Sequence, residues 1–195
     1  MMKADEERQL IELACRGEVE AFMQLVREHE HRILQLTYNL TRNREDAADL
    51  TQETFLQAFR AIKDFKGNSS FLTWLHRIAV NLSLNFLKKH RRERNYLEDI
   101  DSLEEKGRGE ELAEAGGIPS VEDSWLSQEL RTNLEKALEE LPLAFRTTFS
   151  LVVQEGMSHK QAAELLGCSE NTVSWRMHEA RKMLKKKLQP FLSIE

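Results

Sequence analysis

Apolar residues recur every three to four positions along most of the chain, which is the spacing of one face of an α-helix. In the N-terminal half this pattern predicts helices over about 5–15, 18–40, 44–64 and 70–91, and no strand signal competes with it. Four such helices can pack as a bundle. A second group of helical patterns lies toward the C-terminus, so the pattern as a whole predicts an all-α protein.

The C-terminal pattern predicts two helices joined by a short turn. Ser158 and Gln161 form a capping box that starts the first helix, and Gly167 ends it. Ser169 opens the second helix after a turn of three residues. Helices joined so closely cross each other as a helix-turn-helix, which places its second helix in the major groove of DNA.

The second of these helices divides into two stripes. Its apolar stripe comprises Val173, Met177, Ala180, Leu184 and Leu188. The opposite stripe is polar, aromatic and basic, and comprises Asn171, Trp175, His178 and Lys182. An alternative is a solvated helix whose lysines only complement its dipole, but that helix would not need the capped helix and short turn before it.

Three carboxylates share one face of the predicted helix over 44–64. The apolar face that the spacing predicts comprises Ala48, Phe55, Ala58, Phe59 and Ile62. The other face holds Asp46, Asp49 and Glu53, with Gln52 at its edge. This pattern has three interpretations: a solvated surface, a divalent-metal or acid–base site, or an acidic docking surface for a basic partner. No histidine or second carboxylate helix is placed to complete a metal site.

The fourth predicted helix carries basic and aromatic residues instead. Its apolar stripe comprises Phe71, Leu75, Ile78, Leu82 and Phe86. The adjacent outward stripe comprises Trp74, Arg77, Asn81 and Lys88, and an aromatic ring beside cations suits unstacked bases and phosphates. A large aromatic residue beside a core stripe is more often packed than displayed. The polar loop before this helix, residues 65–70, is either a connector or a holder for a base flipped out of a melted duplex.

The composition agrees with a helical protein that spans no membrane. The 195 residues are enough for two small domains, and 41% are apolar, with only three prolines and eight glycines. No apolar run approaches the ~18 residues of a membrane span, and the charged N-terminus is unlike a secretory signal. Cys15 and Cys168 are isolated thiols, which favours a reducing cytoplasm and gives no zinc site. We therefore expect a cytoplasmic protein without a metal or cofactor.

The charge is unevenly distributed along the chain. Residues 1–95 hold 16 Lys and Arg against 14 Asp and Glu, and residues 124–195 hold 10 against 9. Residues 96–123 hold 2 against 10, with four of the eight glycines, and this composition predicts a flexible acidic linker or, in part, a short surface helix. Since the two flanking domains are almost neutral, we expect the isolated protein to bind DNA weakly and to depend on a larger partner.

Two long segments resemble the extracytoplasmic-function family of RNA polymerase sigma factors, within the sigma-70 superfamily. Residues 46–89 are similar to the second conserved region of the family, and the motifs DLTQE and SSFLTWLHRIA occur in its order and spacing. The helix-turn-helix with NTVSWRMHEAR, and the lead-in segment 134–156, are similar to the fourth region. The resemblance implies two helical domains, over 1–95 and 124–195, joined by the linker 96–123.

The family resemblance also implies roles for particular residues. It implies docking on the clamp helices of the polymerase's largest subunit by Asp46, Asp49, Gln52 and Glu53. It implies capture and melting of the minus-ten promoter element by Phe65, Lys66, Asn68, Ser69, Ser70, Trp74, Arg77, Asn81 and Lys88. It implies recognition of the minus-thirty-five element by Ser169, Glu170, Asn171, Thr172, Ser174, Trp175, Arg176, His178, Arg181 and Lys182.

The sequence thus predicts an alternative sigma factor, a non-catalytic subunit that gives RNA polymerase its promoter specificity. The expected partners are core RNA polymerase, through its clamp helices and flap region, and promoter DNA, with an anti-sigma factor as a further candidate. One alternative is a free-standing helix-turn-helix regulator that binds a palindrome as a dimer. A remote one is a metal-dependent nuclease that uses Asp46, Asp49 and Glu53. A dimeric repressor would need neither the acidic face nor a second DNA surface.

Overall fold

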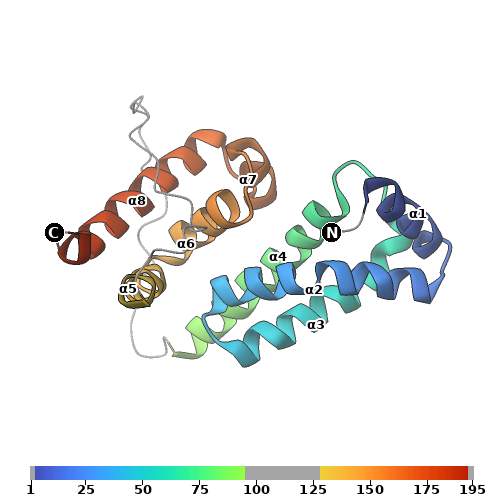
Figure 1. Ribbon diagram of the computed structural model, residues 1–195, viewed down its shortest axis with the longest axis horizontal. Coiled ribbons are helices and arrows are strands. Elements are labelled where there is room, and N and C mark those ends of the chain that lie inside the picture. The colour runs from blue at the N-terminus through green and yellow to red at the C-terminus, as the bar shows by residue number, and fades with distance from the viewer. Residues whose placement is uncertain (1–2, 95–127, 193–195) are drawn as a thin grey trace. The chain divides into compact units, whose positions relative to one another are not determined.

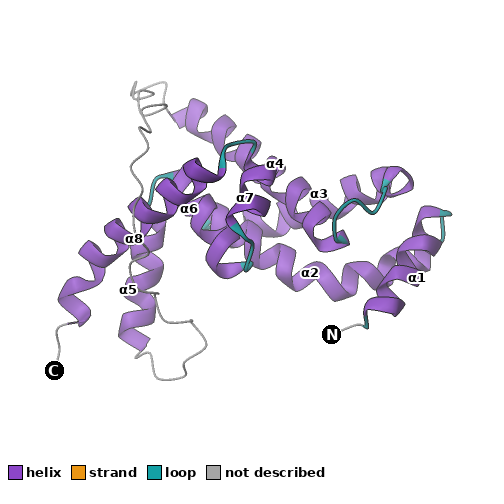
Figure 2. Cartoon of the chain, turned by 90° about the horizontal axis from the view of Figure 1, so that it is seen from above, coloured by secondary structure: helices purple, strands orange, loops and turns teal. Residues whose placement is uncertain are grey.

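The computed structural model describes residues 3–94 and 128–192, which form helices and short connections with no strand among them (Figures 1 and 2). The chain divides into two compact units, residues 1–99 and 100–195. The predicted all-α fold with two helical domains is confirmed. The predicted acidic linker, residues 96–123, lies outside the described residues.

The first unit is a bundle around α2. It comprises α1 (Ala4–Cys15), α2 (Val19–Thr41), α3 (Arg44–Ala61), a 3-10 turn (Ile62–Asp64) and α4 (Phe71–Arg94). Helix α2 packs against the other three helices, and its fully buried side chains form the centre of the core: Leu25, Ile33, Leu36 and Leu40. The four helices agree closely with the four that the spacing predicts.

Local signals explain where α2 ends and α3 begins. The backbone turns left-handed at Arg42, where φ is 57°, and its N–H donates to the Tyr38 carbonyl. Asn43 then caps α3, because its side-chain oxygen accepts from the backbone N–H groups of Glu45 and Asp46 at 2.9 and 3.2 Å. This cap fixes the start of the helix that carries the acidic face.

The buried face of α3 differs from the predicted one. The side chains that α3 buries are Ala47, Leu50, Thr51, Thr54, Phe55 and Ala58. Ala48 is half-buried and Phe59 is 43% exposed, so placing these two in the core was wrong. The reason is that threonines occupy core positions: the Thr51 hydroxyl lies 3.0 Å from that of Thr37 and donates to the Ala47 carbonyl at 2.7 Å. A pattern of apolar residues alone misses this face.

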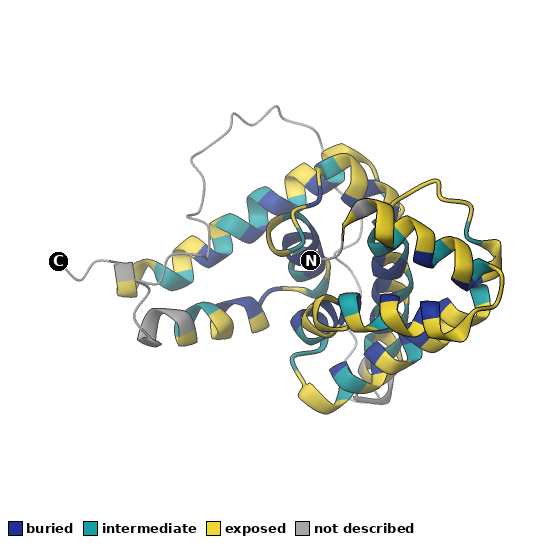
Figure 3. Ribbon diagram, turned by 45° about the vertical axis from the view of Figure 1, so that its right-hand side comes forward, coloured by how far each residue is buried: buried dark blue, intermediate teal, exposed yellow. Residues whose placement is uncertain are grey.

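The predicted core stripe of α4 is also only partly correct. Phe71 and Leu75 are buried, but Ile78, Leu82 and Phe86 are half-buried. The remaining buried positions hold small or polar residues: His76, Ala79, Val80 and Ser83. Because α4 packs against both α2 and α3, its buried arc is wider than a single stripe. Buried and exposed positions succeed one another along the helices (Figure 3).

The second unit surrounds α8. It comprises α5 (Gln128–Glu139), α6 (Leu143–Phe149), a π-helical turn (Ser150–Gln154), α7 (His159–Leu166) and α8 (Glu170–Leu192). Helix α8 packs against α5, α6 and α7. The predicted buried stripe is confirmed at Val173, Met177, Ala180 and Leu184, each at most 1% exposed, while Leu188 is half-buried.

The predicted helix-turn-helix is present. Ser158 accepts from the Gln161 backbone N–H at 3.2 Å, and the Gln161 side chain accepts from the Ser158 N–H at 2.9 Å. Gly167 ends α7 with φ 67°, a left-handed conformation that favours glycine. The chain then enters α8 after three residues, 167–169.

Candidate functional site

The acidic face of α3 is accessible. Asp49 and Gln52 are exposed, and Asp46 and Glu53 are half-buried. Glu53 accepts a hydrogen bond from the Gln57 side chain at 3.3 Å, one turn further along the helix. In the parts of the chain that the structure describes, no three His, Cys, Asp or Glu side chains are grouped to hold a metal ion. The α3 face thus presents two exposed residues, Asp49 and Gln52, and two half-buried carboxylates, Asp46 and Glu53.

Two exposed apolar residues, Leu56 and Phe59, follow the acidic face along α3. Leu56 is 50% exposed and lies one turn after Gln52 and Glu53, while Phe59 also contacts Phe22 of α2 edge-on, with ring centroids 5.1 Å apart. Exposed apolar side chains beside carboxylates are typical of a protein-binding surface. Because the sequence pattern assigned Phe59 to the core, it did not predict this part of the surface.

Residues 65–70 connect the 3-10 turn to α4 and expose polar side chains. Ser70 starts α4, because its hydroxyl accepts from the Thr73 backbone N–H at 3.1 Å and lies 2.7 Å from the Thr73 hydroxyl. The chain turns left-handed at Gly67, where φ is 69°. The exposed residues of this loop are Lys66, Gly67, Asn68, Ser69 and Ser70.

Trp74 belongs to an aromatic cluster at the foot of this loop. Its ring centroid lies 5.1 Å from that of Phe65 and 5.6 Å from that of Phe71, and the two phenylalanines are 5.8 Å apart. Trp74 and Phe65 are half-buried and Phe71 is buried. Trp74 is therefore partly packed, and the cluster links the polar loop to the outward stripe of α4. Arg77, Asn81 and Lys88 of that stripe are exposed.

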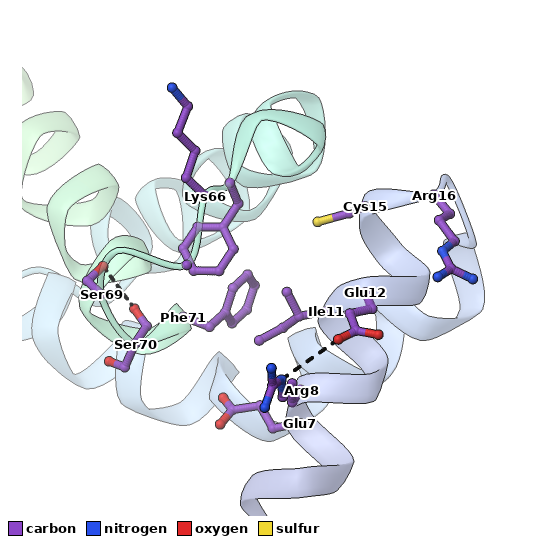
Figure 4. Close-up of a pocket in the computed structure, with 12 residues that line it drawn as sticks. Glu7, Arg8, Ile11, Glu12, Cys15, Arg16, Lys66, Ser69, Ser70 and Phe71 are labelled. Carbon is purple, nitrogen blue, oxygen red and sulfur yellow. Dashed lines mark hydrogen bonds and ion pairs between the residues drawn. The ribbon is translucent and has the colours of Figure 1, made fainter.

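An open hollow of about 710 Å³ lies between this loop and α1 (Figure 4). Its volume is within the range of about 300–1,000 Å³ that is typical of ligand pockets. Ile11 and Phe71 point toward each other across it, and Arg8, Arg16 and Lys66 supply cations around it. The contribution of α1 was not predicted, because its residues lie more than 45 positions before the loop and carry no motif.

His29 of α2 contacts two residues that line the hollow, Glu7 of α1 and Phe71 of α4, and so joins three helices. It is 7% exposed, its Nε2 is 2.9 Å from the Glu7 carboxylate of α1, and its ring centroid lies 5.6 Å from that of Phe71. Burial lowers the pKa of His29 below 6.5, and the Glu7 carboxylate opposes that effect only in part. Neutral His29 thus supports the wall that α1 forms beside the loop.

We expect His29 to make the protein less stable in mild acid. Because the pKa is lower in the folded protein than in the unfolded chain, this contribution is complete above the unfolded pKa of 6.5 and is lost progressively as the pH falls from there through the lower folded pKa. Urea midpoints measured between about pH 7.5 and 5.5 should fall for the parent and fall less for His29→Gln. His31→Gln, at an exposed position, is the control and should follow the parent. An unchanged slope in His29→Gln would contradict this assignment.

In the second unit, α8 presents the predicted outward residues at its N-terminal end. Ser169 precedes the helix and accepts from the Thr172 backbone N–H at 3.1 Å. The exposed members of the predicted set are Ser169, Glu170, Asn171, Ser174, Trp175 and Lys182. The half-buried members are Thr172, Arg176, His178 and Arg181. Exposed polar residues in the first turns, followed by cations, form the arrangement with which a recognition helix meets base edges and phosphates.

Two residues outside the predicted set contact side chains of this α8 surface. The His159 Nδ1 of α7 lies 3.0 Å from the Ser174 hydroxyl, and Phe145 of α6 meets Trp175 with ring centroids 5.4 Å apart. Within α8, Lys182 pairs with Glu179 at 3.7 Å. No short-range pattern could reveal His159 or Phe145, because each contact joins residues at least 15 positions apart.

Comparison with known proteins places these features in one family. The family description Sigma-70 region 2 matches residues 25–93, and Sigma-70, region 4 matches residues 131–184. The RNA polymerase sigma-H factor of Pseudomonas aeruginosa is 34% identical over 193 residues, which are 98% of each chain. The ECF RNA polymerase sigma-E factor of Escherichia coli is 34% identical over 187 residues, which are 94% of each chain.

Solved structures show the same fold. A structure of CnrH in complex with the cytosolic domain of CnrY covers 95% of this chain and 98% of that one, with 25% identity and a TM-score of 0.65. The sigma factor RpoE from Bartonella quintana, solved in complex with the anti-sigma factor NepR, covers 86% and 96%, with 23% identity and a TM-score of 0.65. On the two matched regions and the near full-length relatives, the chain belongs to the extracytoplasmic-function family of RNA polymerase sigma factors.

Proposed function

We propose that this alternative sigma factor docks on the clamp helices of the polymerase's largest subunit through the acidic face of α3. The observation that carries the proposal is an accessible row of Asp49, Gln52 and Glu53 beside exposed Leu56, on a helix whose opposite side is the core of the first unit. Carboxylates beside exposed apolar side chains suit a basic helical partner, because charge orients the encounter and apolar burial supplies affinity.

In the same proposal, the two units bind separate promoter elements. The loop 65–70 with Trp74, Arg77 and Asn81 would hold unstacked bases of the minus-ten element, supported by the aromatic cluster, the exposed polar loop and the cations nearby. The N-terminal turns of α8 would read the minus-thirty-five element in the major groove. The flap region of the polymerase would then contact the second unit.

We further propose that the protein acts in the cytoplasm, where core polymerase and promoter DNA are found, and that it has no catalytic activity of its own. No described helix is long and apolar enough to cross a membrane. An anti-sigma factor stays a candidate partner. The dimeric-repressor alternative has no use for the acidic face, and the nuclease alternative lacks a grouped ligand set in the described parts of the chain.

The isolated protein should bind promoter DNA only at low salt. The domain over 1–95 carries a net charge of only +2 and that over 124–195 only +1, so the protein can neutralise few phosphates without core polymerase. Electrophoretic shifts at about 50 and 200 mM salt, with and without core enzyme, measure this. Tight binding of the isolated protein to a palindromic duplex at the higher salt would favour the dimeric regulator instead.

A further inference from the structure

Trp175 is a large aromatic side chain on the outward face of α8. It lies in the second turn of α8 and is 41% exposed. Its indole has one N–H donor and no acceptor, so it cannot form the paired hydrogen bonds that identify a purine edge. What it offers to the major groove is an apolar surface, and the apolar feature of that groove is the C5 methyl group of thymine.

Phe145 of α6 packs against the indole of Trp175. The Phe145 and Trp175 rings meet at an interplanar angle of 77°, with centroids 5.4 Å apart, which is the edge-to-face geometry that aromatic pairs prefer. Phe145 is half-buried on α6, which packs along α8, so it is itself held by the domain. A side chain oriented before binding loses less conformational entropy when it contacts DNA.

The hydroxyls near Trp175 are already engaged within the domain. The Ser174 hydroxyl lies 3.0 Å from His159 Nδ1, and the Thr172 hydroxyl lies 2.9 Å from that of Ser169. To read bases, these groups must share or exchange those hydrogen bonds. The exposed indole needs no such exchange, which leaves it free for direct contact.

We infer that Phe145 positions Trp175 so that the exposed indole packs on a thymine methyl group in the upstream promoter element. Trp175 touches the base, and Phe145 is a positioning residue that acts through it. This inference rests on the proposed function of the second unit. It assigns to that unit a thymine-specific contact and a residue, Phe145, that lies outside the recognition helix.

Replacing thymine with deoxyuridine tests the contact, because the two bases differ only in the methyl group. We would first select the preferred upstream element with the holoenzyme and then replace each thymine of either strand in turn. Burial of one methyl group corresponds to about a fourfold change in affinity. When uracil replaces thymine at one or two positions, the affinity of the parent holoenzyme should fall by roughly this factor. The affinity of the Trp175→Ala holoenzyme should not change at those positions. The affinity of the Phe145→Ala holoenzyme should fall by clearly less than that of the parent.

The double variant Trp175→Ala/Phe145→Ala should bind no more weakly than Trp175→Ala, since Phe145 acts only through the indole. Phe191→Ala is the matched control, because Phe191 is a 36% exposed aromatic residue in the last turn of α8, and it should keep the parental response to uracil. Circular dichroism checks that each variant stays helical. If Trp175→Ala loses its fold, Trp175→Gln, which keeps side-chain length without the apolar ring, takes its place and should likewise lose the uracil effect.

The outcomes separate this inference from the proposed function. Equal affinity for thymine and uracil at every position, a preferred element without thymine, or a uracil effect that persists without the indole would each overturn the thymine contact while promoter binding stands. A uracil effect that Phe145→Ala leaves at its parental size would overturn the positioning role. If the parent holoenzyme shows no affinity for any upstream element, the proposed function is overturned, and the inference with it.

Discussion

Replacing both Asp49 and Glu53 with lysine should raise the dissociation constant for core RNA polymerase by at least about 100-fold while leaving the helical fold intact. Reversing two charges turns attraction to a basic partner into like-charge contact, which costs several kcal/mol. Neither side chain belongs to the buried face of α3, so little packing is lost. Fluorescence anisotropy of a labelled protein titrated with core enzyme measures the affinity, and thermal unfolding checks the fold.

The control for this experiment is a second double charge reversal in the same unit. Asp5→Lys/Glu30→Lys alters the net charge equally, at exposed positions on α1 and α2. This variant should bind core enzyme within a few-fold of the parent. Equal affinity of the two double variants would show that α3 is not the docking helix.

Changing Asn81 to Ala should leave closed promoter complexes unaffected and reduce strand opening about fivefold. A hydrogen bond from the Asn81 amide to a base is worth about 1 kcal/mol, which is about fivefold, and a contact to an unstacked base exists only once the duplex has melted. Asn81 is exposed on α4, so the fold should tolerate the change. Permanganate reactivity of the minus-ten thymines reports opening, and electrophoretic shifts at low temperature report the closed complex.

Trp74 has to be tested with two variants, because its side chain is partly packed and partly exposed. Its contacts with Phe65 and Phe71 mean that Trp74→Ala removes cluster packing together with any base contact, whereas Trp74→Phe keeps a ring in the cluster. The alanine variant should lose opening and some stability, and the phenylalanine variant should keep more of both. Gln35→Ala, at an exposed position on α2, is the surface control. If Asn81→Ala and Trp74→Ala both open promoter DNA as the parent does, these residues do not melt the minus-ten element.

The spacing of apolar residues was sufficient to predict the helices but not which residues are buried around each one. Signals that act within a few residues, such as the Ser158 capping box and Gly167, were read correctly because their physics is local. The core face of α3 was misread because Thr37 and Thr51 satisfy each other's hydroxyls inside the bundle. That compensation depends on two helices meeting, which a pattern along one helix cannot show.

For the candidate surfaces, too, features set within one helix were predicted and features set by contacts between helices were not. The outward stripes of α4 and α8 were predicted in large part, because charge and spacing within one helix determine them, but Trp74 and His178 are half-buried. The wall that α1 forms beside the loop 65–70, and the contact of Phe145 with Trp175, depend on tertiary packing between distant segments. The exposure of Phe59 likewise depends on how completely α2 covers α3.

Transcription in vitro by purified core RNA polymerase, with and without this protein, is the most direct test of its role as a sigma factor. A library of promoter-length duplexes supplies the templates, and sequencing of the transcript 5′ ends identifies the start sites. We predict that core enzyme alone gives no specific starts, and that the added protein produces starts downstream of one shared pair of sequence elements. Absence of specific starts, despite a folded protein and an active core enzyme, would contradict the assignment.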